Sequence, residues 1–253
     1  MAAKSDQMVL GVALDSFHTL DNFYAPAKSP QQQAVTVLRE GVFTGEQFIG
    51  EQSSGEQAYV YLWGNSGSGV SHLLQGACHQ ALQNGLTVQY LPLDSLLDYP
   101  PEALLEGLEQ THLVCLDNLQ SIAGNAQWEQ ALFHLFNQIK SSGGRLLAGA
   151  NASPKQLAIQ LPDLQSRLSS GLSLQLPPLT DEQKAELLQF CARQRGLELE
   201  DKATQYLLSR LPRGMHELVA VLDRLDKVSL QAQRKLTVPF IRQALVDEAL
   251  AEK

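Results

Sequence analysis

The sequence is poor in basic residues and in cysteine, and it has no long apolar run. Its 19 lysine and arginine residues are outnumbered by 27 aspartate and glutamate residues, which gives a formal net charge of -8 at pH 7. A field of this sign repels a polyanion, so coating DNA by general charge attraction is disfavoured. Apolar runs such as residues 58–63 are far shorter than the roughly 20 residues that cross a bilayer, and no charged-then-apolar leader precedes them. We therefore expect a cytoplasmic protein with no membrane partner.

The three cysteines, Cys78, Cys115 and Cys191, are widely separated and lie in apolar or helical patterns. Their spacing is neither that of a disulfide framework nor that of a zinc site. We interpret them as reduced core residues, and the scattered histidines suggest no metal centre either.

Apolar and amphipathic segments alternate over the first two thirds of the chain. Buried strands are predicted at residues 58–63, 87–94, 112–117 and 145–151. Helices are predicted at residues 29–40, with Ser29 as a cap and Pro30 in the first turn, and at residues 71–85, 100–110 and 125–144. This alternation predicts an α/β fold, with a parallel sheet covered by helices on both faces.

The pattern changes near the double proline Pro177–Pro178, which we interpret as a hinge. Four amphipathic helices are predicted after it, at residues 181–196, 200–211, 214–229 and 237–253. The predicted organisation is a flexible tail over residues 1–16, an α/β domain over residues 17–176, and a small all-α lid over residues 177–253.

A glycine-rich loop, GNSGSGVSHLL, directly follows the strand at residues 58–63. The loop and first helical turn comprise Gly64, Asn65, Ser66, Gly67, Ser68, Gly69, Val70, Ser71 and His72. Such a turn offers backbone N–H groups and the positive end of a helix dipole to an anion. Val70 occupies the position where phosphate-binding loops have lysine, so the site should discriminate less in favour of a triphosphate over a diphosphate. The alternative is a Gly/Ser-rich turn without a ligand.

Polar residues also follow the next two strands. Asp117 ends an apolar strand where a carboxylate, with Ser71, would help to hold Mg²⁺. Asn118 takes the position where hydrolysing proteins of this class have an acid, and an amide cannot accept a proton as a carboxylate does. Asn151 ends the following strand at the same edge of the sheet, where ligands of such folds bind. Alternatively, Asp117 caps the segment that follows it.

These segments, in this order, resemble the AAA+ ATPase family of P-loop proteins. The narrower resemblance is to the replication initiator DnaA and its shorter relative Hda, the regulatory inactivator of DnaA. It covers nearly the whole chain and rests on LDNFYAPAKSPQQQAV, GNSGSGVSHLL, VCLDN, LQSRLSSGL and LDRLDKVSLQAQRKLTVPFI.

The resemblance assigns roles to individual positions. It implies that Asn22, Phe23 and Tyr24 lie near the base of a bound adenine nucleotide, that the glycine-rich loop and His72 surround its phosphates, and that Asn151 is the first sensor. Arg167, which alone would read as a solvated or ion-paired surface arginine, matches an arginine finger that reaches the nucleotide of a neighbouring subunit. Such fingers raise hydrolysis by about 10³-fold to 10⁵-fold.

The tail carries a second resemblance. QMVLGV at residues 7–12 resembles the short motif with which proteins bind the DNA polymerase sliding clamp, the beta subunit. Gln7 would fill a polar pocket, and Met8, Leu10 and Val12 would be apolar anchors.

Three positions depart from the active-hydrolase pattern. They are Val70, Asn118 and His216. The last stands where the lid's second sensor usually has arginine. At each of the three positions, the charged side chain that would act on a γ phosphate is missing. His216 either donates a hydrogen bond to the nucleotide or packs on the lid helix. Because DnaA continues into a helix-turn-helix domain, whereas this chain ends at Lys253, no direct sequence-specific DNA binding is expected.

The resemblance thus implies a negative regulator of DNA replication initiation and not a self-sufficient enzyme. Bound to ADP, with Mg²⁺ as a candidate second ligand, and to the sliding clamp at the replisome, it would stimulate ATP hydrolysis by DnaA in trans through Arg167. The alternatives are an AAA+ ATPase that loads a helicase and a nucleotide-free AAA+ scaffold. Whether the chain forms a homodimer or a larger oligomer is left open.

Overall fold

The computed structural model describes residues 14–41, 59–210, 215–232 and 236–251 of the chain. Apart from Ser66–Ser68, the described residues up to Pro177 form one compact unit and those from Pro178 onward form another. Within the described part of the chain, no helix has the length and hydropathy needed to cross a bilayer.

The amino-terminal unit is built on a parallel sheet, as the sequence predicts. Its strands are β1 (Tyr59–Trp63), β2 (Val88–Pro92), β3 (Leu113–Asp117), β4 (Arg145–Ala150) and β5 (Leu172–Gln175). They lie in the order β2-β3-β4-β1-β5, and every neighbouring pair is parallel. The carboxyl ends of β1, β3 and β4 therefore lie together at one edge, which is where the glycine-rich loop, Asp117 and Asn151 follow their strands.

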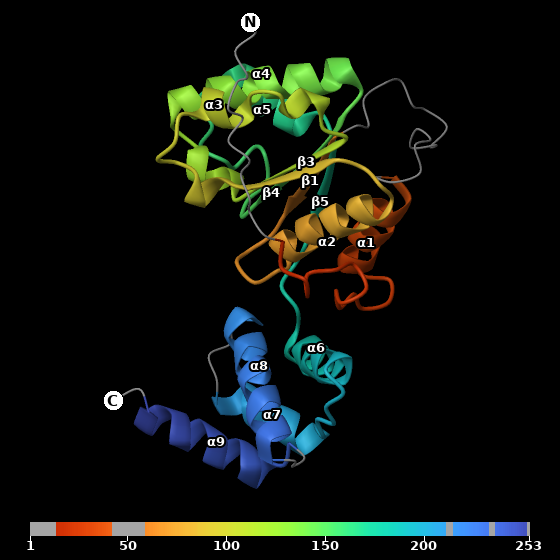
Figure 1. Ribbon diagram of the computed structural model, residues 1–253, viewed down its shortest axis with the longest axis vertical. Coiled ribbons are helices and arrows are strands. Elements are labelled where there is room, and N and C mark those ends of the chain that lie inside the picture. Colours follow the sequence, from red (N-terminus) through yellow and green to blue (C-terminus); the bar gives the residue numbers. More distant parts are fainter. Residues whose placement is uncertain (1–13, 42–58, 211–214, 233–235, 252–253) are drawn as a thin grey trace, which may run out of the picture. The chain divides into compact units, whose positions relative to one another are not determined.

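Helices cover both faces of this sheet (Figure 1). One face carries α1 (Pro30–Gly41) and α2 (Val70–Gln83), and the other carries α3 (Pro101–Leu105), α4 (Ala126–Ser142) and α5 (Pro162–Ser169). Successive residues of β1 serve opposite faces, since Tyr61 packs in the core beneath α4 and Leu62 in the core beneath α2. The two cores together bury the sheet.

Local signals explain where the long helices begin and end. Ser29 Oγ accepts a hydrogen bond from the Gln32 backbone N–H at 3.1 Å, which caps α1 as predicted. Asn125 Oδ1 accepts one from Trp128 N at 3.3 Å and caps α4. The chain leaves α4 at Gly143, whose positive φ of 75° is readily adopted only by glycine.

Two features of this unit differ from the sequence prediction. The helix expected over residues 100–110 is wrong in its second half, because α3 ends at Leu105 and Gly107 takes a left-handed φ of 81°. A short 3₁₀ helix, Leu108–Gln110, follows it. In addition, β5 was not predicted, since this edge strand alternates and exposes Leu172 instead of forming an apolar run.

The carboxy-terminal unit contains the four predicted helices. They are α6 (Asp181–Gln194), α7 (Asp201–Arg210), α8 (Met215–Ala232) and α9 (Val238–Ala251). Their apolar faces meet in one core that includes the fully buried Leu188, Leu222 and Ile241. A capping box between Thr180 and Gln183 begins α6, with both reciprocal hydrogen bonds present.

Candidate nucleotide-binding site

The glycine-rich loop lies between the end of β1 and the start of α2. Gly64 N donates a 3.2 Å hydrogen bond to Ala150 O, which joins the start of the loop to the end of β4. Gly67 and Gly69 have positive φ values of 79° and 95°, so the loop needs glycine at both positions to enter the helix. Ser71 follows in the first turn of α2. A long helix that begins at such a loop suits the binding of an anion at its N-terminus.

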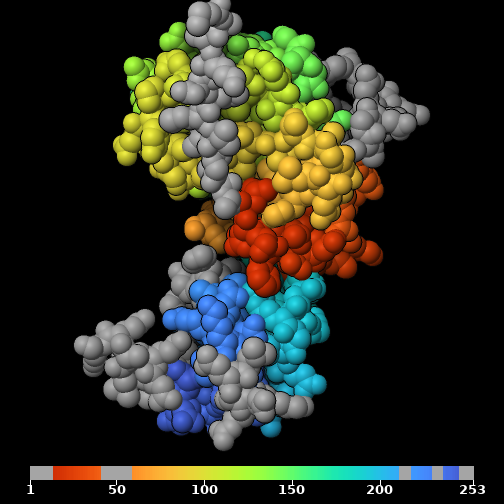
Figure 2. Space-filling model, in the orientation of Figure 1, coloured from red at the N-terminus to blue at the C-terminus, as the bar shows by residue number. Residues whose placement is uncertain are grey.

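Residues 14–25, called the strap below, lie against α2 and the loop (Figure 2, red). A Cβ atom placed on Gly69 would lie only 2.6 Å from Phe23 Cε2, so the Phe23 ring occupies the space directly above this glycine. The side chain of Asn22 turns back on the strap itself and donates to Phe17 O at 3.2 Å. Among the three predicted base-site residues, Phe23 thus packs against the loop, whereas the side chain of Asn22 bonds within the strap.

Side chains on one stripe of α2 hold the strap. His72 Nε2 and His79 Nε2 donate to the Thr19 and Asp15 carbonyl oxygens at 2.8 Å each, and Gln75 Oε1 accepts from Asp15 N at 2.9 Å. Burial, partly offset by the bond to Thr19, lowers the pKa of His72 to about 4. His72 is thus neutral near pH 7, and its ring binds the strap instead of supplying charge to a phosphate.

Asp117 is almost fully buried, with 2% of its surface exposed. Its Oδ2 accepts a 2.6 Å hydrogen bond from the Tyr90 hydroxyl, and its Oδ1 accepts from Asn118 N at 2.8 Å. The second bond supports the left-handed turn at Asn118, so the capping interpretation of Asp117 describes part of what this carboxylate does. Burial and the neighbouring Asp117 raise the pKa of Tyr90, which keeps its hydroxyl a donor.

One glutamine links the polar residues that follow β3 and β4. Gln120 Nε2 donates to Asn118 Oδ1 at 3.1 Å, while Gln120 Oε1 accepts from Asn151 N at 3.1 Å. Sequence reasoning missed both Gln120 and Tyr90. Gln120 lies only two residues beyond Asn118, but its contact with Asn151 depends on the strand order. Tyr90 was missed because it looks like one more apolar residue of a buried strand.

Val70 is buried under the loop, with 8% of its surface exposed. A Cβ atom on Gly149 of β4 would lie 2.6 Å from Val70 Cγ1 and 3.2 Å from Asp117 Oδ1. Val70 and the Asp117 carboxylate therefore approach the same spot above β4. A longer basic side chain at position 70 would start beside this carboxylate.

The donor set at this edge fits a metal ion only in company with a nucleotide. Within the described residues, no group of three or more His, Cys, Asp or Glu side chains is arranged to hold a metal ion. Ser71 and Asp117 offer oxygen ligands, and Mg²⁺ in phosphate-binding sites takes one or two such ligands and completes its shell with waters and phosphate oxygens. The two residues thus suit Mg²⁺ bound together with phosphates.

Arg167 lies away from this edge. It occupies the last turn of α5, between Leu164 and Leu168, which are buried in the core beneath α4. The chain then passes Gly171, packed on Tyr59 at the start of β1, and begins β5 beside Val60. Arg167 is therefore near the amino ends of the strands, whereas the glycine-rich loop follows their carboxyl ends.

The guanidinium of Arg167 makes no hydrogen bond or ion pair with any residue that the structure describes. His216 lies in α8, and its side chain is outside the described residues, as are the tail positions Gln7, Met8, Leu10 and Val12.

Two family models match the chain. The bacterial DnaA ATPase domain matches residues 40–175, and the lid domain of Hda matches residues 181–245. An uncharacterized protein of Haemophilus influenzae is 51% identical over 191 residues, which are 75% of this chain and 82% of that protein.

Solved structures share the fold at low sequence identity. Domain III of the Thermotoga maritima replication initiation protein DnaA superposes with a TM-score of 0.72 at 21% identity, covering 93% of this chain and 98% of that one. AMPPCP-bound DnaA from Aquifex aeolicus gives 0.68 at 22% identity, covering 85% and 67%. The RuvB Holliday junction branch migration motor of Thermotoga maritima gives 0.64 at 15% identity, covering 90% and 71%.

Proposed function

The chain belongs to the DnaA-related AAA+ family and carries an Hda-type lid, and from this premise we propose that it regulates replication initiation by acting on the nucleotide of DnaA. In the proposed state it holds ADP, is bound through its tail to the DNA polymerase sliding clamp, and docks on ATP-bound DnaA. Arg167 then completes the partner's active site, and ATP is hydrolysed there. The product, ADP-bound DnaA, no longer initiates.

The observation that carries this proposal is the position of Arg167. Its guanidinium has no partner among the described residues and lies near the amino edge of the sheet, opposite the chain's own glycine-rich loop. A cation in that place cannot serve its own phosphate site, but it is free to meet the nucleotide of another subunit. A guanidinium set against a transferring phosphoryl group stabilises the charge of the transition state.

The chain's own nucleotide is proposed to be a diphosphate. Gly67 and Gly69 shape the loop, Ser71 and Asp117 would hold Mg²⁺, and Phe23 packs where the loop meets the strap. Bound Mg²⁺ would neutralise phosphate charge. With Val70 in place of lysine and Asn118 in place of an acid, the site lacks groups that grip a γ phosphate or activate water, so intrinsic hydrolysis would be weak or absent. That Aquifex aeolicus DnaA binds AMPPCP supports a nucleotide at this position.

The clamp contact is proposed from the tail sequence. Gln7, Met8, Leu10 and Val12 match a short clamp-binding motif and precede the strap by only a few residues. Tethering at the clamp would confine the activity to replicating DNA in the cytoplasm.

The test is a reconstituted assay with sliding clamp loaded on DNA and ATP-bound DnaA. Wild-type protein should accelerate hydrolysis, and Arg167→Ala should lose about 10³-fold of that stimulation while binding nucleotide and clamp normally. Arg193→Ala, an exposed arginine of α6, is the matched control and should stimulate like wild type. Full stimulation by Arg167→Ala would overturn the proposed function.

A nucleotide-free scaffold is the second candidate, because both Asp117 oxygens already accept hydrogen bonds from Tyr90 and Asn118. Calorimetric titration with ADP and with ATP separates the two: affinity for neither nucleotide leaves only the scaffold. Substantial ATP turnover by the isolated protein would instead favour an ATPase of the helicase-loader kind.

A further inference from the structure

Glu129 is a buried carboxylate that contacts no other charged group in the described chain. It lies in the first turns of α4, and 1% of its surface is exposed. Three backbone N–H groups donate to it: Gly124 to Oε1 at 2.7 Å, Gln160 to Oε1 and Oε2 at 3.1 and 2.9 Å, and Leu161 to Oε2 at 2.7 Å. Three donors compensate the loss of hydration that such burial costs.

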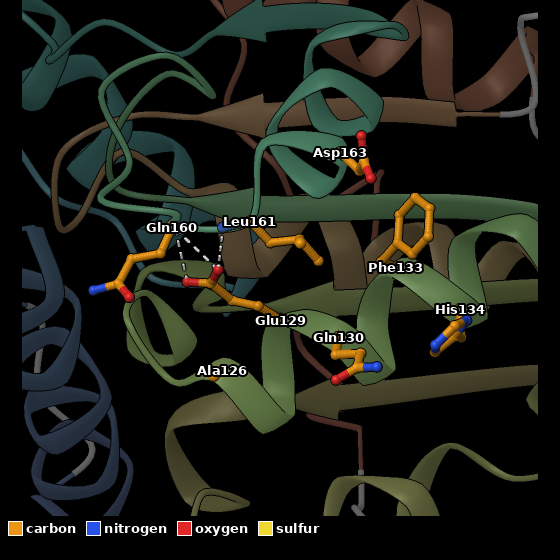
Figure 3. A pocket seen from close by; sticks show the side chains of 8 residues that line it. All are labelled: Ala126, Glu129, Gln130, Phe133, His134, Gln160, Leu161 and Asp163. Atoms are coloured by element: carbon orange, nitrogen blue, oxygen red, sulfur yellow. Dashed lines mark hydrogen bonds between the residues drawn. The ribbon is translucent and has the colours of Figure 1, made fainter.

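Two of these donors fix the beginning of α5. Leu161 is the N-cap residue of α5, Gln160 precedes it, and Pro162 opens the helix. Figure 3 shows the Glu129 carboxylate pointing at both backbone nitrogens, with Phe133 and the pocket to one side. This pocket, about 460 Å³ in volume, leaves Gln160 and Leu161 partly unpacked on their outer side. The hydrogen bonds to Glu129 therefore hold this end of α5 together with the packing of Ile159 and Leu161 on the core.

We propose that Glu129 is the positioning residue for Arg167: by anchoring the first residues of α5 it sets where the guanidinium is presented to the partner's nucleotide. This rests on the proposed function. The helix is short, 8 residues or about 12 Å. Leu164 and Leu168 bind its inner face to the core, and Gly171 packs on Tyr59 beyond its far end. At the end opposite Arg167, Glu129 supplies the polar restraint beside the core packing of Ile159 and Leu161.

A small tilt of α5 at its start would displace Arg167 by a distance that affects catalysis. A tilt of about 5° at one end of a helix of about 12 Å moves the other end by about 1 Å. Misplacement of a catalytic group by that distance can cost about 10²-fold in rate. Loss of the Glu129 anchor should therefore reduce the stimulation of hydrolysis. The chain's own nucleotide site should be unaffected, because Glu129 bonds to Gly124, Gln160 and Leu161 and not to Ser71 or Asp117.

Glu129→Gln tests the proposal in the reconstituted assay, because the amide nitrogen cannot accept a hydrogen bond and would face a backbone N–H. The maximal stimulation at saturating protein should fall at least tenfold, the concentration for half-maximal stimulation should stay within about twofold, and ADP affinity should be unchanged. Amide exchange at Gln160 and Leu161 should become faster. Ile139→Ala is the control. Ile139 is buried in the far turns of α4, away from the start of α5, so its truncation should lower stability without disturbing that end of the helix.

Each outcome decides the matter. A fall in maximal stimulation beyond that of Ile139→Ala, at a temperature where both variants are folded, supports positioning by Glu129. Equal maxima for the two variants, or a change only in the half-maximal concentration, would overturn it, since Glu129 would then stabilise the fold or the docking surface alone. If Arg167→Ala itself stimulates fully, the proposed function fails instead.

Discussion

The hydroxyl of Tyr90 in β2 donates a 2.6 Å hydrogen bond to Asp117 Oδ2 at the end of β3. Gln75 of α2 donates to the same hydroxyl at 3.4 Å, so three elements of the amino-terminal unit meet at one oxygen. Because both Asp117 oxygens accept hydrogen bonds, the carboxylate is oriented before any ligand arrives. Partners of this kind behind a metal ligand fix its direction and tune its affinity.

Tyr90→Phe should therefore weaken nucleotide binding only where Mg²⁺ takes part. Removing the hydroxyl leaves one buried Asp117 oxygen without its donor, which costs about 1–3 kcal/mol of unfolding free energy. Affinity for ADP with Mg²⁺ should fall about 10-fold to 100-fold, while affinity for ADP in EDTA should stay the same. Titration calorimetry measures both affinities.

Tyr99→Phe is the matched control, since Tyr99 is 48% exposed and should change neither quantity. Urea unfolding followed by tryptophan fluorescence measures the stability of the amino-terminal unit, because both tryptophans, Trp63 and Trp128, lie in it. An unchanged affinity in Mg²⁺ would mean that Asp117 acts only as a cap.

Val70→Lys should raise the affinity for ATP relative to ADP. Val70 begins α2 beside the Asp117 carboxylate, and a lysine there would add a charge within reach of the β and γ phosphates. A charged hydrogen bond of about 1.5–3 kcal/mol corresponds to a gain of roughly tenfold or more for ATP. Val70→Met keeps a long apolar side chain without the charge, so it should show no gain. Equal ATP affinities for the two variants would contradict the role given to position 70.

Short-range sequence patterns predict the parallel sheet, four of its strands and the residues that follow their ends. Each of these signals lies within one local segment: an apolar run, then glycines at residues 64–69, or an apolar run ending in Asp117. Strand order brings such ends together in any sheet of this topology. Sequence reasoning therefore places the candidate site before any contact between segments is known.

The contacts behind the site depend on pairs that are far apart in the chain. Tyr90 of β2 donates a hydrogen bond to Asp117 of the neighbouring strand β3. Glu129 accepts one from Leu161 N, from which it is separated in sequence by the rest of α4 and by β4. The local sequence around Tyr90 and Glu129 gives no sign of these contacts. Tyr90 looks like a core residue of a strand, and Glu129 looks like a polar residue near the start of a helix. Only the packed structure shows that Glu129 is buried and fully bonded.

Cys78 and Cys115 form another pair that spacing could not predict, with their sulfurs 3.4 Å apart between α2 and β3. Both are buried, and burial, followed by the contact with Cys78, raises the pKa of the Cys115 thiol well above its usual value. A protonated, inaccessible thiol reacts slowly. We expect no reaction of either cysteine with Ellman's reagent in the folded protein and full reaction in urea. Rapid labelling of the folded protein would show that α2 opens readily from β3.

The strap should loosen as the pH falls through the range set by His72. Its pKa is about 4 in the folded protein, with His18 and Asp15 as the neighbouring titratable groups, and about 6.5 in the unfolded chain. Between these values the unfolded chain binds a proton that the folded one does not, so the stabilisation is complete above pH 6.5 and is lost as the pH approaches 4. The loss is at most about 3 kcal/mol. Urea unfolding at pH 7 and pH 5 measures this loss as a difference in unfolding free energy. Because glutamine does not titrate, the difference should be smaller in His72→Gln. His134→Gln, a substitution at an exposed histidine, is the control and should keep the wild-type difference.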